Sequence, residues 1–174
     1  RGLGDVYKRQ TIEDVILMLK GIDFWDQLET VFIPVKIPEL TYGQRIDLSS
    51  MNTRYDLLFI PQKVLLGLEE KEVMSKPFIS VYNYGLSVYR ELERMRIRDE
   101  KTFKYNPTAE EVKAGFYGID HGVFGVVDRI AQRLSISHEA VFDLPERRIY
   151  AMMKIDYDNG MYQRRLNQII SKQK

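Results

Sequence analysis

Two histidines, His121 and His138, are the residues in this sequence that most readily suggest a metal site. They lie seventeen residues apart, and the chain has no cysteine that could complete a set of ligands. Zinc prefers tetrahedral sites of histidine and cysteine, so a site here would need carboxylates to fill it. The sequence therefore favours two ordinary histidines, on the surface or partly buried, and predicts no metal ion.

The segment Asp156-Tyr-Asp-Asn-Gly160 partly matches a calcium-binding loop, in which carboxylate and amide oxygens surround the ion. Its glycine stands at the fifth position of the loop rather than the sixth, and the twelfth position is Asn167 rather than a glutamate. Residues 158–160 therefore predict a turn and not a calcium site.

Four glycines, at positions 115, 118, 122 and 125, could be interpreted as a loop that holds a phosphate. No Lys-Ser/Thr pair follows them, and no predicted strand precedes them, so a junction between two helices is favoured. Asp120 and His121 are adjacent, but neighbouring side chains need not face each other, and no serine lies in a nucleophile context. The sequence predicts no catalytic residue and no cofactor, and hence no enzyme.

A possible helix-turn-helix between residues 126 and 150 is the remaining pattern that could indicate a function, namely DNA binding. Its second helix would begin with His138-Glu-Ala-Val-Phe-Asp143, which is acidic and apolar, whereas a DNA reader needs cations and amides at this place. The net charge of the chain is only +1, which is not typical of a nucleic-acid binder. Binding to nucleic acid is therefore an alternative and not the main prediction.

The elements that must position these residues are mostly helices. Apolar residues from Phe78 to Met95 recur every three or four positions, which predicts one long helix with a charged outer face. Capping-box spacings predict helix starts at Thr41 and Thr108, and further helices are expected over residues 11–20, from Asn52, over 69–76, from Val123, after Ser137 and from Pro145. The predicted fold is mainly α. In the helical stretch that follows Asn52, Pro61 and Gly67 are expected to interrupt the apolar positions 57, 58, 64 and 65.

One small β element is expected near the N-terminus. Residues 31–37 (VFIPVKI) are rich in β-branched and aromatic side chains, and Pro34 confines them to an edge or a bend. No apolar run approaches the length of a membrane span. We therefore expect no membrane partner, and the lack of cysteine suits an intracellular compartment.

Residues 1–10 (RGLGDVYKRQ) match no helix or strand pattern and resemble the translation of a transposon-end adaptor used in sequencing libraries. The natural start of the protein is therefore expected to be missing. Residues 11–174 then predict a single α-rich domain, with a possible sub-boundary near residues 105–108. Without the first ten residues the formal net charge is −1, from 23 basic and 24 acidic residues.

The candidate partner-binding residues are aromatic and basic. Tyr82 and Tyr89, with Tyr84 between them, are spaced along the long helix, and aromatic side chains are enriched at interfaces. Arg164 and Arg165 open a C-terminal stretch with four positive charges and no negative ones. This stretch is interpreted either as the solvated end of a helix or as a docking segment for an acidic partner.

Five segments resemble the tail assembly chaperones of long-tailed bacteriophages, particularly those from gut Bacteroides-type hosts. They are residues 35–44 (VKIPELTYGQ), 107–115 (PTAEEVKAG), 124–131 (FGVVDRIA), 139–145 (EAVFDLP) and 162–169 (YQRRLNQI).

This resemblance implies a non-catalytic morphogenesis factor in the cytoplasm of an infected cell. Such a protein binds the tape-measure protein, keeps its helices from aggregating and helps to recruit tail-tube subunits, and self-association is possible. A groove that holds amphipathic helices would suit this role. The alternatives are a helical interaction domain with an unknown partner and a helix-turn-helix DNA-binding protein.

Overall fold

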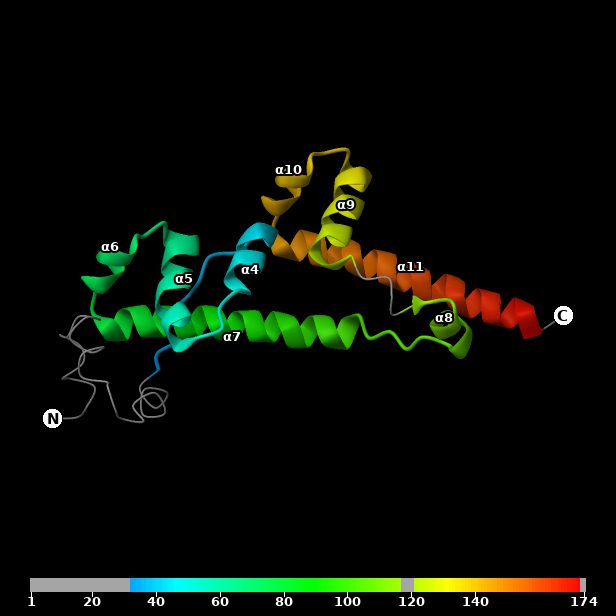
Figure 1. The fold of residues 1–174 in the computed structure, drawn as a ribbon, viewed down its shortest axis with the longest axis horizontal. Helices are drawn as coiled ribbons and strands as arrows, with labels where there is room; N and C mark the ends of the chain where they lie inside the picture. Colours follow the sequence, from blue (N-terminus) through cyan, green and yellow to red (C-terminus); the bar gives the residue numbers. More distant parts are fainter. Residues whose placement is uncertain (1–31, 117–120, 173–174) are drawn as a thin grey trace. The chain divides into compact units, whose positions relative to one another are not determined.

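The structure is a computed structural model that describes residues 32–116 and 121–172. These residues form helices and connecting segments, with no β-sheet among them (Figure 1). The predicted mainly helical fold is confirmed for this part of the chain. The adaptor-like residues 1–10 and the helix predicted over residues 11–20 lie outside it.

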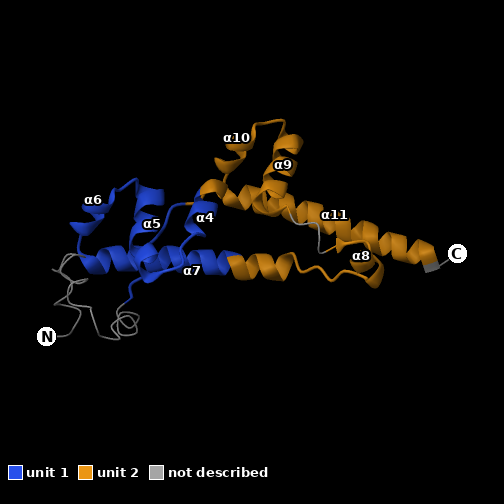
Figure 2. Ribbon diagram, in the orientation of Figure 1, with its two compact units in different colours: residues 1–38, 44–95 blue, residues 39–43, 96–174 orange. Residues whose placement is uncertain are grey.

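Two compact units make up the chain (Figure 2). Unit 1 comprises residues 1–38 and 44–95, and unit 2 comprises residues 39–43 and 96–174. The boundary after Met95 falls inside a helix. A single domain over residues 11–174 stays a prediction.

The described part of unit 1 is built from most of α4 (Tyr42–Leu48), α5 (Arg54–Leu66), α6 (Glu70–Met74) and most of α7 (Phe78–Thr102). Thr53 caps α5 in a reciprocal box with Asp56, and Gly67 ends this helix in the left-handed conformation, at a φ of 66°. The apolar faces of α5, α6 and α7 meet in one core, which contains Leu58, Phe59, Val73, Phe78, Val81, Tyr82 and Leu86. The predicted apolar face of the long helix is thereby confirmed.

The prediction that Pro61 breaks the helix after Asn52 is wrong, because α5 runs through this residue to Leu66. Proline has no N–H group, so the Leu57 carbonyl, four residues earlier, loses its usual helical partner. This carbonyl meets α7 at Gly85, where an added Cβ atom would lie 2.0 Å from the Leu57 oxygen. Glycine at position 85 therefore lets the two helices approach closely.

The predicted strand over residues 31–37 is not formed in its described part, residues 32–37. The backbone N–H of Ile33 donates to the Asn83 side chain at 3.2 Å, and that of Val35 donates to the Ser87 hydroxyl at 2.9 Å. Asn83 and Ser87 are one turn apart on α7, so side chains of a helix satisfy this segment instead of a neighbouring strand.

Unit 2 contains the end of α7, α8 (Ala109–Lys113), α9 (Gly122–Leu134), α10 (His138–Phe142) and α11 (Glu146–Lys172). Residues 39–43 join them: the Tyr42 N–H donates to the Leu144 carbonyl, and the Glu146 N–H donates to the Leu40 carbonyl, each at 2.9 Å. The buried apolar residues of this unit are Leu40, Tyr42, Val127, Ile130, Ala131, Val141, Ile149 and Met152.

Helix α11 continues without interruption through residues 158–160, so the predicted turn there is wrong. The partial calcium-loop pattern of residues 156–160 therefore lies on a helix. An exposed glycine is tolerated inside a helix at a cost of about 1 kcal/mol. Here Gly160 is exposed, and that cost is small beside the many backbone hydrogen bonds of a 27-residue helix.

The start of α11 is held by a partly buried ion pair. Glu146 is 3% exposed, and its carboxylate accepts a hydrogen bond from the Arg98 guanidinium at 2.5 Å. The same guanidinium lies 3.7 Å from the centre of the Tyr150 ring. Burial alone would lower the pKa of Arg98, but its hydrogen bonds to Glu146 and Asp99 outweigh this and raise it. The pair fixes the end of α7 against α11 within unit 2.

Candidate partner-binding site

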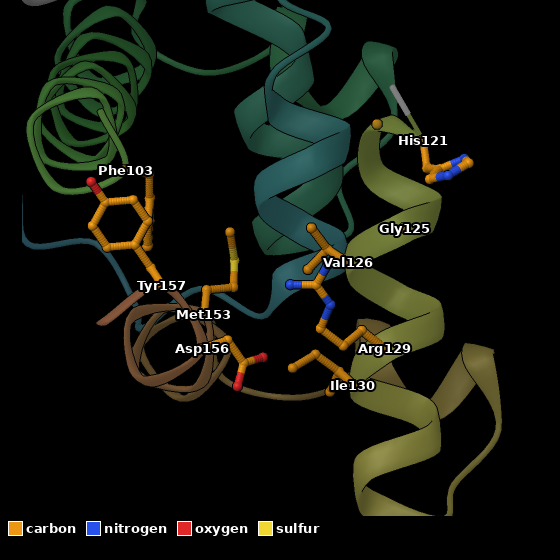
Figure 3. Close-up of a pocket in the computed structure, with 10 residues that line it drawn as sticks. Phe103, His121, Gly125, Val126, Arg129, Ile130, Met153, Asp156 and Tyr157 are labelled. Atoms are coloured by element: carbon orange, nitrogen blue, oxygen red, sulfur yellow. The ribbon is translucent and has the colours of Figure 1, made fainter. Parts of the chain in front are cut away.

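An open pocket in unit 2 lies between α9, α11 and the segment that follows α7 (Figure 3). Its volume is about 440 Å³. Apolar side chains line most of it: Phe103, Val126, Ile130 and Met153. A pocket of this size and lining fits an apolar side chain better than it fits a polar metabolite.

Aromatic packing fixes one wall of the pocket. The rings of Phe103 and Tyr157 meet edge to face with their centres 5.8 Å apart, and the Tyr157 hydroxyl donates to the Lys104 carbonyl at 2.5 Å. Opposite them, Ile130 is anchored in the core with 1% of its surface exposed. The wall is therefore formed before any ligand binds.

The glycines at the start of α9 shape the other end of the pocket. Gly122 has a φ of 51°, and a Cβ atom added at Gly125 would lie 2.8 Å from the His121 Cβ atom. Gly115 also has a positive φ, of 92°. The predicted glycine junction is thus confirmed at Gly115 and Gly122, whereas Gly125 lies inside α9 and Gly118 lies outside the described residues.

The rim of the pocket carries a positive charge. The Asp156 carboxylate forms an ion pair with the Arg133 guanidinium, at 3.0 Å. Arg129 lines the pocket, is exposed, and forms no ion pair with any residue that the structure describes. The side chains of Arg129, Ile130, Met153 and Asp156 point toward a common space in Figure 3, whereas His121 points away from it. An acidic group at this rim would meet Arg129.

Over residues 32–116 and 121–172, no group of three or more histidine, aspartate or glutamate side chains is placed to hold a metal ion. Among the helices that the structure describes, none is both long and apolar enough to cross a membrane.

The two predicted tyrosines of α7 occupy different environments in unit 1. Tyr82 is 3% exposed and stacks on Phe78, with ring centres 6.0 Å apart. Tyr89 is 47% exposed. A partner of the folded chain can reach Tyr89 directly, but it would have to open the core to reach Tyr82. The hydroxyl of Tyr84 is buried without a described hydrogen-bond partner, and this burial raises its pKa.

The two predicted arginines of α11 also differ. Arg164 donates to the Asn106 carbonyl at 2.9 Å, lies 3.4 Å from the Glu111 carboxylate and covers the Tyr105 ring. It therefore ties α11 to the segment around α8. Arg165 is exposed and donates through Nε to the Met161 carbonyl of its own helix. Only Arg165 of this pair projects toward solvent.

The helices of the possible helix-turn-helix do pack on each other. Between α9 and α10, Ser135 adopts the left-handed conformation and Ser137 caps the second helix. Helix α10 has five residues, with Glu139 in its first turn. So short a helix gives little more than one turn, and its acidic start would face phosphates, so the arrangement offers a poor reader of DNA.

Sequence reasoning missed the pocket because its walls come from distant segments. Phe103 and Tyr157 are more than fifty residues apart, and neither belongs to a recognisable motif. The glycine series next to Val126 was the one available signal, and it indicated a junction rather than a binding site. No protein family matches this chain, and no curated protein or solved structure matches it either.

Proposed function

We propose that this chain is a non-catalytic assembly chaperone that binds a helix of its partner at the pocket of unit 2. The observation that carries the proposal is the combination of an apolar pocket with the unpaired Arg129 at its rim. Metal-assisted and nucleophilic chemistry find no support in the residues that line it.

The partner that fits is an amphipathic helix with a leucine or an aromatic residue as its anchor. An aspartate or glutamate three or four positions from the anchor lies on the same face of such a helix. The anchor would then enter the space beside Met153 and Phe103 while the carboxylate pairs with Arg129. Grooves that bind helices commonly combine apolar anchoring with charge matching at the rim.

The resemblance to tail assembly chaperones identifies the proposed partner as the tape-measure protein of a phage tail. One of the resembling segments, residues 124–131, contributes Val126, Arg129 and Ile130 to the pocket. In this role the chain covers apolar faces of the tape-measure helices in the cytoplasm of the infected cell. It also helps to recruit tail-tube subunits, as the resemblance implies.

The test is binding to tape-measure fragments from the phage genome that encodes this chain. Co-expressed fragments should co-purify, and Arg129→Glu should weaken binding about tenfold or more, because it replaces attraction by repulsion at the rim. Lys113→Glu is the matched control: it reverses an exposed cation of α8 that lies outside the pocket, and it should leave the affinity unchanged.

Four results would overturn parts of the proposal or favour an alternative to it. Failure of every tape-measure fragment to bind removes the phage role. Binding that Arg129→Glu and Lys113→Glu weaken equally removes the pocket as the site. Tight, salt-sensitive binding to duplex DNA, without any bound helix, would instead favour the helix-turn-helix alternative. Capture of an unrelated helical protein through Arg129 would favour the alternative of a general helical interaction domain.

A further inference from the structure

Helix α11 has a second surface, distinct from the pocket. Five large apolar side chains on it are between one third and three fifths exposed: Ile155 48%, Tyr162 58%, Leu166 36%, Ile169 56% and Ile170 47%. The opposite face of the same helix packs inside unit 2 through Tyr157 and Arg164. We call the exposed set the α11 stripe.

The spacing of the α11 stripe matches a coiled-coil seam. The seam runs through Ile155, Asn159, Tyr162, Leu166 and Ile169, at intervals of four, three, four and three residues. Four of these residues belong to the stripe, and Asn159 is the polar exception. Apolar residues at alternating intervals of three and four keep one face of a helix against a partner helix. A single asparagine within such a seam specifies register and orientation at some cost in stability.

We propose that two copies of this chain associate through the α11 stripe, with the two helices antiparallel. Asp158 and Arg165 stand on the same flank of the seam, seven residues apart. When the symmetry axis passes between Gly160 and Met161, Asp158 of each copy faces Arg165 of the other. The stripe is therefore complementary to itself in charge as well as in shape.

The apolar pairing agrees with this register. In an antiparallel coiled coil, each a position of one helix packs against a d position of the other. Ile155 therefore packs against Leu166 of the second copy, and Asn159 packs against Tyr162. A shift by seven residues in one direction sets Asp158 against Asp158, and a shift in the other direction sets Arg165 against Arg165. In a parallel pair Asp158 would face Gln163 and Arg165 would face Ile170, which leaves both charges unmatched.

Both charged side chains retain the atoms that this pairing needs. Asp158 bonds Lys154 through Oδ2, at 2.6 Å, which leaves Oδ1 for a second cation. Arg165 uses Nε within its own helix and keeps its two terminal nitrogens. The stripe and Arg129 are different groups, so this inference goes beyond the proposed function and does not depend on it. A dimer would display two pockets to one long partner, which raises avidity without new contacts.

The first experiment is a charge swap on the full chain, followed by sedimentation at several concentrations. Asp158→Arg and Arg165→Asp should each raise the dimer dissociation constant about tenfold, because each sets like charges opposite each other twice. The double variant restores opposite charges and should recover the affinity of the unchanged chain. Lys113→Glu should have no effect. A monomer at all concentrations, or two single variants that dimerise normally, would overturn the inference.

The second experiment fixes the orientation by disulfide cross-linking, since the chain has no cysteine of its own. A mixture of Ile155→Cys chains and Leu166→Cys chains, one of them tagged, should give the mixed cross-link. Leu166→Cys alone should not cross-link, because its two copies are offset by eleven residues, or about 16 Å along the helices. This exceeds the span of about 7 Å that a disulfide allows between Cα atoms. The opposite pattern indicates parallel helices and would overturn the inference.

Discussion

Glu111 shows how one residue can set a local structure. Its carboxylate accepts hydrogen bonds from the Thr108 N–H and from the Tyr105 hydroxyl, each at 2.7 Å, and lies 3.4 Å from the Arg164 guanidinium. The backbone hydrogen bond from Thr108 is the largest cause, and together these contacts hold the pKa of Glu111 below its ordinary value of 4.5. The capping box predicted at Thr108 is thus extended into a link between α8 and α11.

We expect this carboxylate to contribute to acid stability. Because its pKa is lowered in the folded protein, its stabilising effect is present above the ordinary value of 4.5 and is lost as the pH falls through the lower folded value. The melting temperature should therefore fall less between pH 5 and pH 3 in Glu111→Gln than in the unchanged chain. Thermal unfolding followed by circular dichroism at both pH values measures this difference.

Glu110→Gln is the matched control for that experiment. Glu110 is exposed on the same helix, and its side chain forms no hydrogen bond or ion pair with the residues that the structure describes. Its substitution should leave the pH dependence as it is in the unchanged chain. An equal flattening by both substitutions would show that the link between Glu111, Tyr105 and Arg164 does not operate in solution.

At the scale of elements, two glycines inside helices should respond to alanine in opposite ways. Gly85→Ala would place a methyl group 2.0 Å from the Leu57 carbonyl oxygen, and backbone at a helix crossing cannot give way easily. Overpacking of this kind costs about 1–3 kcal/mol or more. Gly160→Ala meets nothing within 4 Å and should stabilise α11 by about 1 kcal/mol.

Chemical unfolding of the two variants measures both changes in the free energy of unfolding. Gly160→Ala is also the direct test of the continuity of α11. If residues 158–160 formed the turn that the sequence predicted, with positive φ at the glycine, alanine would destabilise the chain instead. If Gly160→Ala destabilises the chain, residues 158–160 form a turn in solution and α11 is not continuous there.

These elements show where sequence reasoning succeeds. The apolar spacing from Phe78, the capping box at Thr108 and the start of a helix at Pro145 are all local patterns, and α7, α8 and α11 begin where they indicate. Local hydrogen bonds and the interval of an apolar face decide such features, so the sequence carries them directly.

Other elements could not be predicted because distant contacts decide them. Pro61 stays inside α5, since Gly85 accommodates the Leu57 carbonyl that proline leaves without a partner. The segment after residue 31 has the composition of a strand, but Asn83 and Ser87 of α7 supply its hydrogen-bond partners. No pattern within either segment reveals those contacts.

The candidate site was predictable only in part for the same reason. Exposure separates Tyr89 from Tyr82 and Arg165 from Arg164, and exposure depends on the whole fold. The spacing of Tyr82, which follows Phe78 by one turn, equally fits a core position and an interface position. The pocket required Phe103, Arg129 and Met153 to meet across three separate segments.

At the scale of the molecule, each unit has a core of its own. Phe78 and Val81 are buried in unit 1, and Ile130 and Ile149 are buried in unit 2, each at 1% exposure or less. The boundary between the units falls within α7, so one continuous helix contributes to both. Separate cores permit one unit to open while the other stays folded.

Hydrogen–deuterium exchange of two destabilised variants tests whether the units open separately. Gly85→Ala should lower the protection of amides in α5 more than tenfold while it leaves those in α9 nearly unchanged. Ile149→Ala removes a fully buried side chain of unit 2, at a cost of about 2–5 kcal/mol. It should lower the protection of amides in α9 and leave those in α5 nearly unchanged. Equal loss of protection in α5 and α9 for both variants would mean that the units unfold together. In that case α7 would couple the two cores into one cooperative structure, and the pocket of unit 2 would depend on the packing of Gly85 in unit 1.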